Sequence, residues 1–468
     1  MGKKLKTALY ILSILGTASL LLLAGCGLFR GGPGEESQEA AVEEESETQE
    51  EEEASSSIIT TITLWDYLEP RERMALMESR DSFLSANRDI NIETRHFRNQ
   101  EELQDQFEAA SLAGAGPQLL LLDFDGVNRL APSNVVKEIV EEVDYAFVLD
   151  GLKEISSYSG RNYIVPFRAY DFLILFYNKD LVENVPRDFE GIFSYIQEMV
   201  PEEEGGEQFR FLLNEGEADW IIPFIGGYNG WIIDYTSNSL TLDTMAMQRT
   251  LEFLDYAYNQ ESLLRGGLEY GEINELFKTG AAHMVIDYYS TAEEYKAAGI
   301  DVGLAKIPRV WQGTRYPTPY MSGFGFMINI NTYEEQLDAS RKFINFMLSE
   351  DVQDDWNLNT ATLPVLTDLE QSQTITNDPL LKAAFEQAKI CRGKPYDQIL
   401  MVIRNAIDDN VESLLAGDII PEDAALKIQE DAIRLKSGII PLEEKEEGEQ
   451  AQDGDQEDAG TGAENIDD

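Results

Sequence analysis

The chain has 468 residues, of which 43% are hydrophobic and 10% aromatic, which is enough apolar material for a packed core and excludes a wholly disordered protein. Its 87 Asp and Glu residues outnumber 36 Lys and Arg residues and give a formal net charge of −51. Because this charge repels phosphate backbones, the composition excludes a nucleic-acid-binding protein.

The first 25 residues have the order of a bacterial secretion signal. Lysines near the N-terminus precede an apolar run at 8–24, which is short for a membrane-spanning helix. The following box, Leu23-Ala24-Gly25-Cys26, resembles the lipoprotein signal, in which the cysteine is lipidated and becomes the first mature residue. Since two acyl chains suffice for stable anchoring, we expect a lipid anchor at Cys26 and a protein on the extracytoplasmic face of the cell membrane.

Two acidic segments have the composition of disordered chain. Residues 26–57 hold an almost unbroken Glu run with Gly, Pro and Ser, and they are predicted to form an extended tether. The tail at 442–468 is similar. These segments carry less than half of the excess charge, so the folded surface is expected to be acidic too. The only other cysteine is Cys391, so modification of Cys26 leaves no intramolecular disulfide.

Strands alternate with helices in the first part of the folded region. The spacing of apolar residues predicts strands at 58–64, 90–97 and 119–122, and helices at 70–84 and around 103–110, the latter broken at 114–117. Such alternation predicts a parallel sheet with helices on both faces. Ligand clefts on these sheets lie at the carboxyl ends of the strands.

Aromatic and acidic residues gather at those strand ends. Trp65, Tyr67 and Glu69 follow the first strand, and Asp123 and Asp125 follow the third. A further strand at 163–167 leads to Tyr170 and Asp171 before the apolar run at 172–177. Rings mixed with carboxylates are typical of a binding site; the alternative is that Trp65 packs in the core and the carboxylates are solvated surface groups.

The α/β pattern continues at greater length toward the C-terminus. A strand is predicted at 284–286, and helical patterns recur at 245–259, 273–279, 334–348, 379–390, 398–415 and 421–436.

Several segments resemble the extracellular solute-binding proteins of ABC importers, in particular the maltose-binding-protein-like family. They are Thr63-Leu64-Trp65, Gly116-Pro117-Gln118, Phe176-Tyr177-Asn178-Lys179-Asp180-Leu181, Leu276-Phe277-Lys278-Thr279-Gly280-Ala281-Ala282 and Ser322-Gly323-Phe324-Gly325. The resemblance implies a two-lobed periplasmic-binding-protein-like α/β fold that closes over one ligand and docks on a permease.

The resemblance also implies a set of ligand contacts. Carboxylates that contact sugar in the family fall at Glu69, Asp125, Asp171 and Glu215, a cleft Arg at Arg404, a wall Trp at Trp220 and a stacking ring at Tyr289. Two other stacking positions are Leu122 and Leu400, and a Gly-Pro-Trp pattern reads Asp287-Tyr288-Tyr289, which makes Tyr288 a further candidate. These departures speak against a maltodextrin ligand.

Three kinds of function are compatible with an acidic, aromatic cleft. Carboxylates accept hydrogen bonds from sugar hydroxyls, and rings pack on sugar C–H faces, which favours a carbohydrate or polyol. The same carboxylates would attract a cationic solute such as a polyamine. Paired carboxylates can also cleave glycosidic bonds, which leaves a secreted glycosidase as the enzyme alternative.

Motifs for catalysis and metal binding are missing from the sequence. There is no nucleophile elbow, phosphate loop or zinc motif, and His96 and His283 are the only histidines. Both are predicted to be structural. We therefore expect no catalytic residue, no metal and no cofactor, and a monomeric binding protein whose partners are a small solute and the transmembrane subunits of an ABC permease.

The predicted organisation has five parts. They are a signal peptide at 1–25, a lipidated tether at 26–57, lobe I at 58–169 with 326–358, lobe II at 170–325 with 359–441, and a tail at 442–468. Each lobe is predicted to hold a mainly parallel sheet flanked by helices.

Overall fold

The computed structural model describes residues 59–141, 144–198, 208–260, 263–360 and 362–439. The predicted signal peptide, Cys26, the tether and the tail lie outside the described residues. The described residues form one compact unit. Within the described ranges, no helix combines the length and apolar character needed to cross a membrane.

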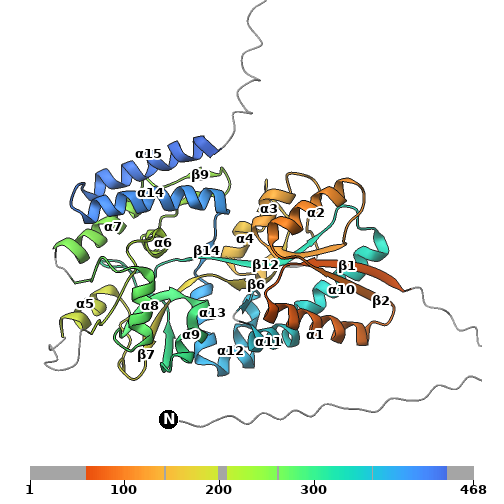
Figure 1. Cartoon of the computed structure of the whole chain (residues 1–468), viewed down its shortest axis with the longest axis horizontal. Helices are drawn as coiled ribbons and strands as arrows, with labels where there is room; N and C mark the ends of the chain where they lie inside the picture. Colours follow the sequence, from red (N-terminus) through yellow and green to blue (C-terminus); the bar gives the residue numbers. More distant parts are fainter. Residues whose placement is uncertain (1–58, 142–143, 199–207, 261–262, 361, 440–468) are drawn as a thin grey trace, which may run out of the picture. The chain divides into compact units, whose positions relative to one another are not determined.

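A mixed seven-stranded sheet organises one half of this unit (Figure 1). Its strands are β1 (Thr60–Asp66), β2 (Ile90–His96), β3 (Leu119–Asp123), β6 (Val165–Tyr170), β12 (Tyr320–Ile328), β13 (Leu363–Pro364) and β14 (Arg392–Gly393). The order is β13-β6-β12-β3-β1-β2, with β14 paired to β12. β1 is parallel to β2 and β3, whereas β12 is antiparallel to β3 and β6.

The second sheet has three strands, β7 (Leu173–Asn178), β10 (Met284–Tyr288) and β11 (Val302–Ala305), in the order β10-β7-β11. Both pairings are antiparallel. The expectation of mainly parallel sheets is therefore corrected, although the α/β class is confirmed. Alternation of strands and helices in the sequence does not show whether a long connection returns to the same end of the sheet or to the opposite end. That choice sets the direction of the next strand.

Helices and short elements surround the two sheets. Near the first sheet are α1 (Pro70–Ala86), α2 (Gln100–Leu112), α3 (Asp125–Leu130), α4 (Asp150–Ile155), α10 (Glu334–Met347) and α11 (Glu350–Asn359). The remaining helices are α5 (Phe189–Gln197), α6 (Ala218–Gly227), α7 (Met245–Leu254), α8 (Tyr270–Lys278), α9 (Ala292–Ala297), α12 (Gln373–Asn377), α13 (Pro379–Ala388), α14 (Asp397–Leu415) and α15 (Pro421–Ile439). There are two short hairpins, β4 (Ser157–Tyr158) with β5 (Arg161–Asn162) and β8 (Ile233–Asp234) with β9 (Ser239–Leu240). The 3-10 helices are η1 (Tyr145–Phe147), η3 (Tyr289–Thr291) and η4 (Thr367–Gln371), and η2 (Asp255–Gln260) is a π-helical turn that continues α7.

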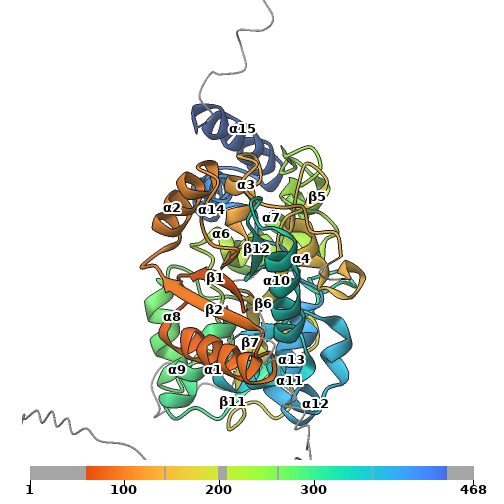
Figure 2. The ribbon, with the colours of Figure 1, turned by 90° about the vertical axis from the view of Figure 1, so that its right-hand side faces the viewer.

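The apolar run of β3 is buried on both faces of the first sheet. Leu119 and Leu121 belong to a cluster with side chains of α1 and α10, whereas Leu120 and Leu122 belong to a cluster with side chains of α2 and α3. Figure 2 shows α1 and α2 on opposite sides of β1 and β2. Because successive strand residues point to opposite faces, a continuous apolar run is what a strand covered on both faces requires.

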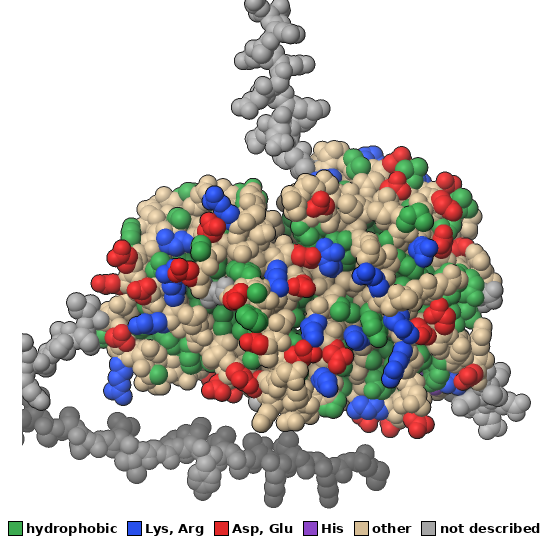
Figure 3. Space-filling view, turned by 180° about the vertical axis from the view of Figure 1, so that it is seen from behind, with side chains coloured by type: hydrophobic (Ala, Val, Ile, Leu, Met, Phe, Trp, Pro, Cys, Tyr) green, Lys and Arg blue, Asp and Glu red, His purple; other side chains and the backbone are tan. Residues whose placement is uncertain are grey.

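Charged side chains of both signs cover the outside of the unit. Figure 3 shows acidic and basic groups intermixed over the face seen from behind. Pairs such as Lys389 with Glu370 (2.7 Å) and Lys179 with Asp301 (2.9 Å) are partly exposed. Since exposed pairs contribute only about 0–1 kcal/mol each, the buried clusters and not the surface charges stabilise the fold.

Neighbouring protein groups contact the side chains of Cys391, His96 and His283, which indicates structural roles. Cys391 is buried, and its thiol donates to the Gln387 carbonyl at 3.4 Å. His96 pairs with Asp66 at 2.7 Å. His283 is buried, and its burial lowers its pKa to about 4. Among the described residues, no group of His, Cys, Asp and Glu is arranged to hold a metal ion.

The chain passes directly from one sheet to the other after β6. Tyr170 ends β6 and Leu173 begins β7, so Asp171 and Phe172 alone connect the sheets at this point. β12 lies antiparallel beside β6, and a Cβ atom on Gly323 would lie 2.1 Å from the Arg168 carbonyl oxygen. The two strands therefore approach more closely than any side chain at Gly323 would allow.

We expect Gly323→Ala to lower the free energy of unfolding by about 1–3 kcal/mol, because the added methyl group must push two backbones apart. Urea denaturation of purified protein measures the change. Gly271→Ala is the matched control: Gly271 lies in α8 with open space around it, so alanine should stabilise the helix by about 0.5–1 kcal/mol. Equal effects of the two substitutions on the free energy of unfolding would contradict the close approach of β6 and β12.

Candidate ligand-binding site

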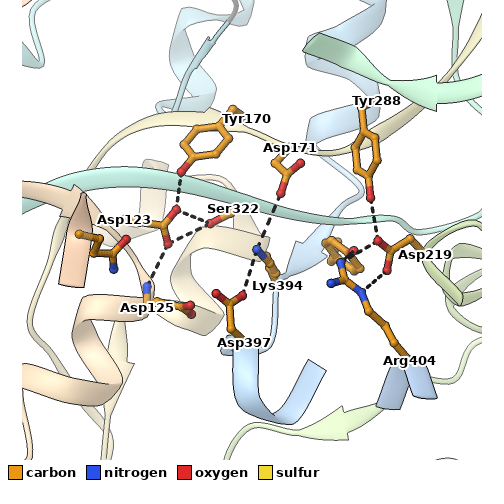
Figure 4. Close-up of polar contacts among 12 residues, drawn as sticks. Asp123, Asp125, Tyr170, Asp171, Asp219, Tyr288, Ser322, Lys394, Asp397 and Arg404 are labelled. Atoms are coloured by element: carbon orange, nitrogen blue, oxygen red, sulfur yellow. Dashed lines mark hydrogen bonds and ion pairs between the residues drawn. The ribbon is translucent and has the colours of Figure 1, made fainter. Parts of the chain in front are cut away.

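Polar side chains from both sheets meet near the passage from β6 to β7 (Figure 4). They come from the end of β3, the start of α3, the β6–β7 junction, α6, β10, β12 and the segment that leads into α14. We call this set the polar network; its members are Asp123, Asp125, Tyr170, Asp171, Asp219, Tyr288, Tyr320, Ser322, Lys394, Asp397 and Arg404.

Asp123 accepts hydrogen bonds from three neighbours. The Tyr170 hydroxyl donates to its Oδ2, and the Asp125 amide donates to its Oδ1 at 3.0 Å. The Ser322 hydroxyl lies 3.3 and 3.4 Å from the two carboxylate oxygens. Burial raises the pKa of Asp123, although the hydrogen bonds from Tyr170 and Asp125 lower it. These donors fix the carboxylate at the carboxyl end of β3.

Asp171 occupies an unusual backbone position between the two sheets. Its φ of 60° lies in the left-handed region, which costs energy for a residue with a side chain. Its Oδ2 lies 3.8 Å from the Lys394 ammonium, which also pairs with Asp397 at 3.2 Å. Burial raises the pKa of Asp171, and the nearby Lys394 opposes this rise. Strained residues of this kind concentrate at functional sites because the surrounding structure must enforce them.

Asp219 and Arg404 form a forked ion pair between α6 and α14. Nε and Nη2 of Arg404 donate to the two Asp219 oxygens at 2.6 Å each. The Tyr288 hydroxyl donates to Asp219 at 2.7 Å, and Arg404 also donates to the Tyr320 hydroxyl at 2.7 Å. The Asp219 side chain is only 9% exposed. The fork therefore holds a buried carboxylate with strong, charge-assisted bonds.

Asp125 and Asp397 face each other from α3 and α14. Burial raises the pKa of Asp125, and the Asp123 carboxylate and a hydrogen bond with Asp397 raise it further. The pKa of Asp397 is lowered by the same hydrogen bond and by Lys394, despite some burial. Asp125 thus carries the proton and Asp397 the charge, which links an element of the first sheet to α14.

Together these groups can bind a hydroxyl-rich molecule. Carboxylates accept hydrogen bonds, while the ammonium, guanidinium and phenol groups donate them, so both functions of a hydroxyl group find a partner.

Six of the predicted site residues belong to the polar network: Asp123, Asp125, Tyr170, Asp171, Tyr288 and Arg404. A seventh, Tyr67, lies against it, because its hydroxyl accepts from the Asp123 amide at 3.2 Å and donates to Gln100 at 2.7 Å.

Trp65 and Glu69 have structural roles instead. The Trp65 ring is 8% exposed, packs on Phe97 at 4.9 Å and lies under the Arg95 guanidinium. Glu69 forms the capping box of α1 with Glu72, whose carboxylate accepts from the Glu69 amide at 3.1 Å. Core packing uses the Trp65 ring and helix capping uses the Glu69 side chain, so neither belongs to the polar network, and their contact with a ligand stays a prediction.

Glu215 and Trp220 are also removed from the network. Trp220 is 1% exposed, and its ring nitrogen donates to the Ile286 carbonyl at 2.7 Å, so its ring presents no surface to a solute. Glu215 is buried and accepts from the Gly267 amide at 2.6 Å. Trp220 thus ties α6 to β10, and Glu215 ties its loop to Gly267.

Tyr288 and Tyr289 diverge. The Tyr288 hydroxyl reaches Asp219, whereas the Tyr289 ring stacks on Phe172 at 5.4 Å. Tyr289 lines a different cavity of about 610 Å³ together with Arg71, Lys296 and Asp378. Tyr289 therefore lies outside the polar network, and its predicted stacking on a ligand stays a prediction.

Sequence reasoning missed Asp219, Tyr320, Ser322, Lys394 and Asp397. Ser322 lies in a segment that resembles the solute-binding family, but nothing marked its hydroxyl as a site group. Lys394 and Asp397 lie just before a predicted helix, where charge is common. Asp219 lies next to Trp220 but had no pattern of its own. In a chain with 87 acidic residues, only the fold separates these carboxylates from the surface ones.

The chain was compared with known protein families, proteins and structures. A family model described as "Bacterial extracellular solute-binding protein" matches residues 78–383. A maltotriose-binding protein of Pyrococcus abyssi is 23% identical over 393 residues, which cover 81% of this chain and 83% of that protein.

Two further relatives have similar coverage. A maltooligosaccharide ABC transporter solute-binding lipoprotein of Streptococcus pneumoniae is 22% identical over 71% of this chain and 78% of its own. The structure of an extracellular solute-binding protein of Staphylococcus aureus in complex with maltose matches with a TM-score of 0.70 at 17% identity, over 82% of this chain and 99% of that chain. At this identity the structural match concerns the fold.

Proposed function

Because this chain belongs to the family of bacterial extracellular solute-binding proteins, we propose that it captures a carbohydrate outside the membrane and delivers it to the transmembrane subunits of an ABC importer. The predicted two-lobed α/β fold is confirmed by its structural neighbours. The observation that supports a sugar most strongly is the polar network, in which carboxylates and cationic donors from both halves converge. The relatives named for maltotriose and maltooligosaccharides point to the same class.

The proposed mechanism is closure of two lobes over the solute. Lobe I comprises 58–169 with 326–358, and lobe II comprises 170–325 with 359–441. Because β12 and β13 both pair with β6, we assign residues 320–325 and 363–364 to lobe I as well. A solute that contacts Asp125 on one lobe and Arg404 on the other stabilises the closed state, and the importer then accepts the closed monomer.

Isothermal titration calorimetry of the purified chain with maltotriose, a galactooligosaccharide and putrescine tests this function. We expect a sugar to bind at one site per chain and to raise the thermal midpoint, since ligand at 100 times its Kd adds about 2.7 kcal/mol of stability. Binding of putrescine without any sugar would support the cationic alternative. Release of shorter sugars, followed by chromatography, would support a glycosidase.

We expect Asp171→Ala to weaken sugar binding by about 1.5–3 kcal/mol, the strength of hydrogen bonds to a charged group. Calorimetry with the best-binding sugar measures this change. Asp171→Gly is the second variant, because glycine removes the carboxylate but relieves the positive φ. Asp180→Ala, at an exposed position after β7, is the control that should bind normally. Unchanged affinity in both Asp171 variants would remove this residue from the site.

We propose that Cys26 holds the protein on the membrane through its lipid. Cys26→Ser should move the protein from the membrane fraction to the soluble extracytoplasmic fraction, because the two acyl chains supply the membrane affinity. Immunoblots of fractionated cells measure the distribution, and mass spectrometry of the N-terminus identifies the lipid. Membrane retention of Cys26→Ser would contradict the anchor.

A further inference from the structure

Lys394 reaches the middle of the polar network from the segment between β14 and α14. Its amide donates to the Met321 carbonyl at 2.9 Å, which fixes it to β12. The preceding residues are fixed as well, because Glu154 accepts from the Gly393 amide at 2.9 Å and from Arg392 at 2.6 Å. The Lys394 side chain is 20% exposed. The backbone that carries this side chain is therefore fixed beside the polar network.

The charges around this ammonium are unbalanced. Asp171 and Asp397 pair with Lys394, and the Asp123 carboxyl group also acts on it, whereas the neighbouring Asp125 keeps its proton. Burial lowers the pKa of Lys394, but the surrounding acidic groups outweigh burial and raise it overall, so the side chain stays charged. The other nearby cation, Arg404, is already forked to Asp219. Lys394 is thus the cation that compensates this group of acids.

We propose that Lys394 is a built-in counter-cation that reserves the site for uncharged, hydroxyl-rich solutes. It occupies the position among the carboxylates that the amine of a cationic solute would take, and it repels such an amine. A neutral solute suffers no such repulsion, and its hydroxyls can accept from the ammonium and donate to the carboxylates. This inference deepens the proposed function and rests on it, since it favours a sugar over a polyamine as the ligand of the same site.

The test compares wild type with Lys394→Met and Lys394→Arg. Putrescine and propylammonium are the probes, and thermal midpoints are read at constant ionic strength against NaCl. We expect no specific response in wild type or Lys394→Arg. Lys394→Met should have a lower midpoint that each amine raises by several degrees, because the added cation replaces the missing one. Lys394→Gln carries the same expectation and serves as the second variant if Lys394→Met does not fold.

Lys179→Met is the matched control, since Lys179 forms an exposed pair with Asp301 outside the network. Its midpoint should not respond to amines. Putrescine binding by wild type, or equal amine responses of wild type and the Lys394→Met and Lys394→Gln variants, would overturn the inference. Maltotriose titration separates the two proposals. If wild type binds no sugar while the amines rescue Lys394→Met alone, the sugar function fails and the counter-cation stands.

Discussion

Replacing Arg404 with methionine is expected to lower the free energy of unfolding by about 2–4 kcal/mol. Removing one partner of a fully buried ion pair costs about 3–5 kcal/mol, because the other charge is left without compensation. Asp219 is 9% exposed and would keep hydrogen bonds from neutral phenol groups, such as the Tyr288 hydroxyl, in place of a cation. The Arg404 side chain is 36% exposed, so water replaces part of the loss and the expected value is reduced. Urea denaturation followed by circular dichroism measures it.

Arg434→Met is the matched control for this prediction. Arg434 pairs with Asp431 on α15, and these side chains are 72% and 28% exposed, so its loss should cost about 0–1 kcal/mol. Asp219→Asn combined with Arg404→Met should recover part of the stability, because the uncompensated charge is then gone. If Arg404→Met and Arg434→Met proved equally mild, the fork would not be a stabilising feature of the cleft.

Raising the pH from about 4 to 8 is expected to weaken the contact between α3 and α14. Burial, Asp123 and Asp397 raise the pKa of Asp125 from 3.8 to about 8. Between pH 3.8 and about 8, Asp125 keeps its proton in the folded chain but releases it in the unfolded chain. Its contribution to stability is therefore complete below pH 3.8 and is lost as the pH rises toward about 8. The free energy of unfolding should fall by at most about 1.4 kcal/mol per pH unit from this group.

Asp125→Asn should flatten this dependence, since asparagine does not titrate, and urea midpoints at several pH values measure the slope. His283→Gln provides a control of opposite sign. The pKa of His283 is lowered from 6.5 to about 4, so the unfolded chain takes up the proton first and stability from this group is lost as the pH falls through that range. The fall of stability with rising pH should therefore steepen in His283→Gln. An unaltered slope in Asp125→Asn would rule out this carboxyl group as its source.

The periodic elements could be predicted because their spacing records which faces are buried. The run at 119–122 became β3, and the patterns at 334–348 and 398–415 became α10 and α14 within a few residues. β12 was not predicted, because Gly323 and Gly325 interrupt its pattern, and these glycines are needed for the close approach to β6. Strand direction in the second sheet was also beyond local patterns, since long connections set it.

Site residues could be predicted from the sequence where they follow a strand. They could not be predicted where side-chain packing decides which residue reaches the site. Asp123 and Asp171 follow strands and belong to the polar network. Tyr288 and Tyr289 are neighbours at the end of β10, and the sequence alone could not tell which ring would reach Asp219. Trp220 is of the residue type that packs on sugars, but its ring fills a core that aromatic residues of α6, α7 and α8 share.

The surroundings of Cys391 make the chain convenient for labelling. The sequence has two cysteines, so Cys391 alone remains after Cys26→Ser. Its burial raises its pKa well above the usual range, which leaves almost no thiolate for a maleimide dye to attack. New cysteines at exposed positions, such as Leu112→Cys on α2 and Met401→Cys on α14, can therefore carry a fluorescent donor and acceptor while Cys391 stays in place. Energy transfer between the two dyes would report, for single molecules, the fraction of time that the two lobes are closed.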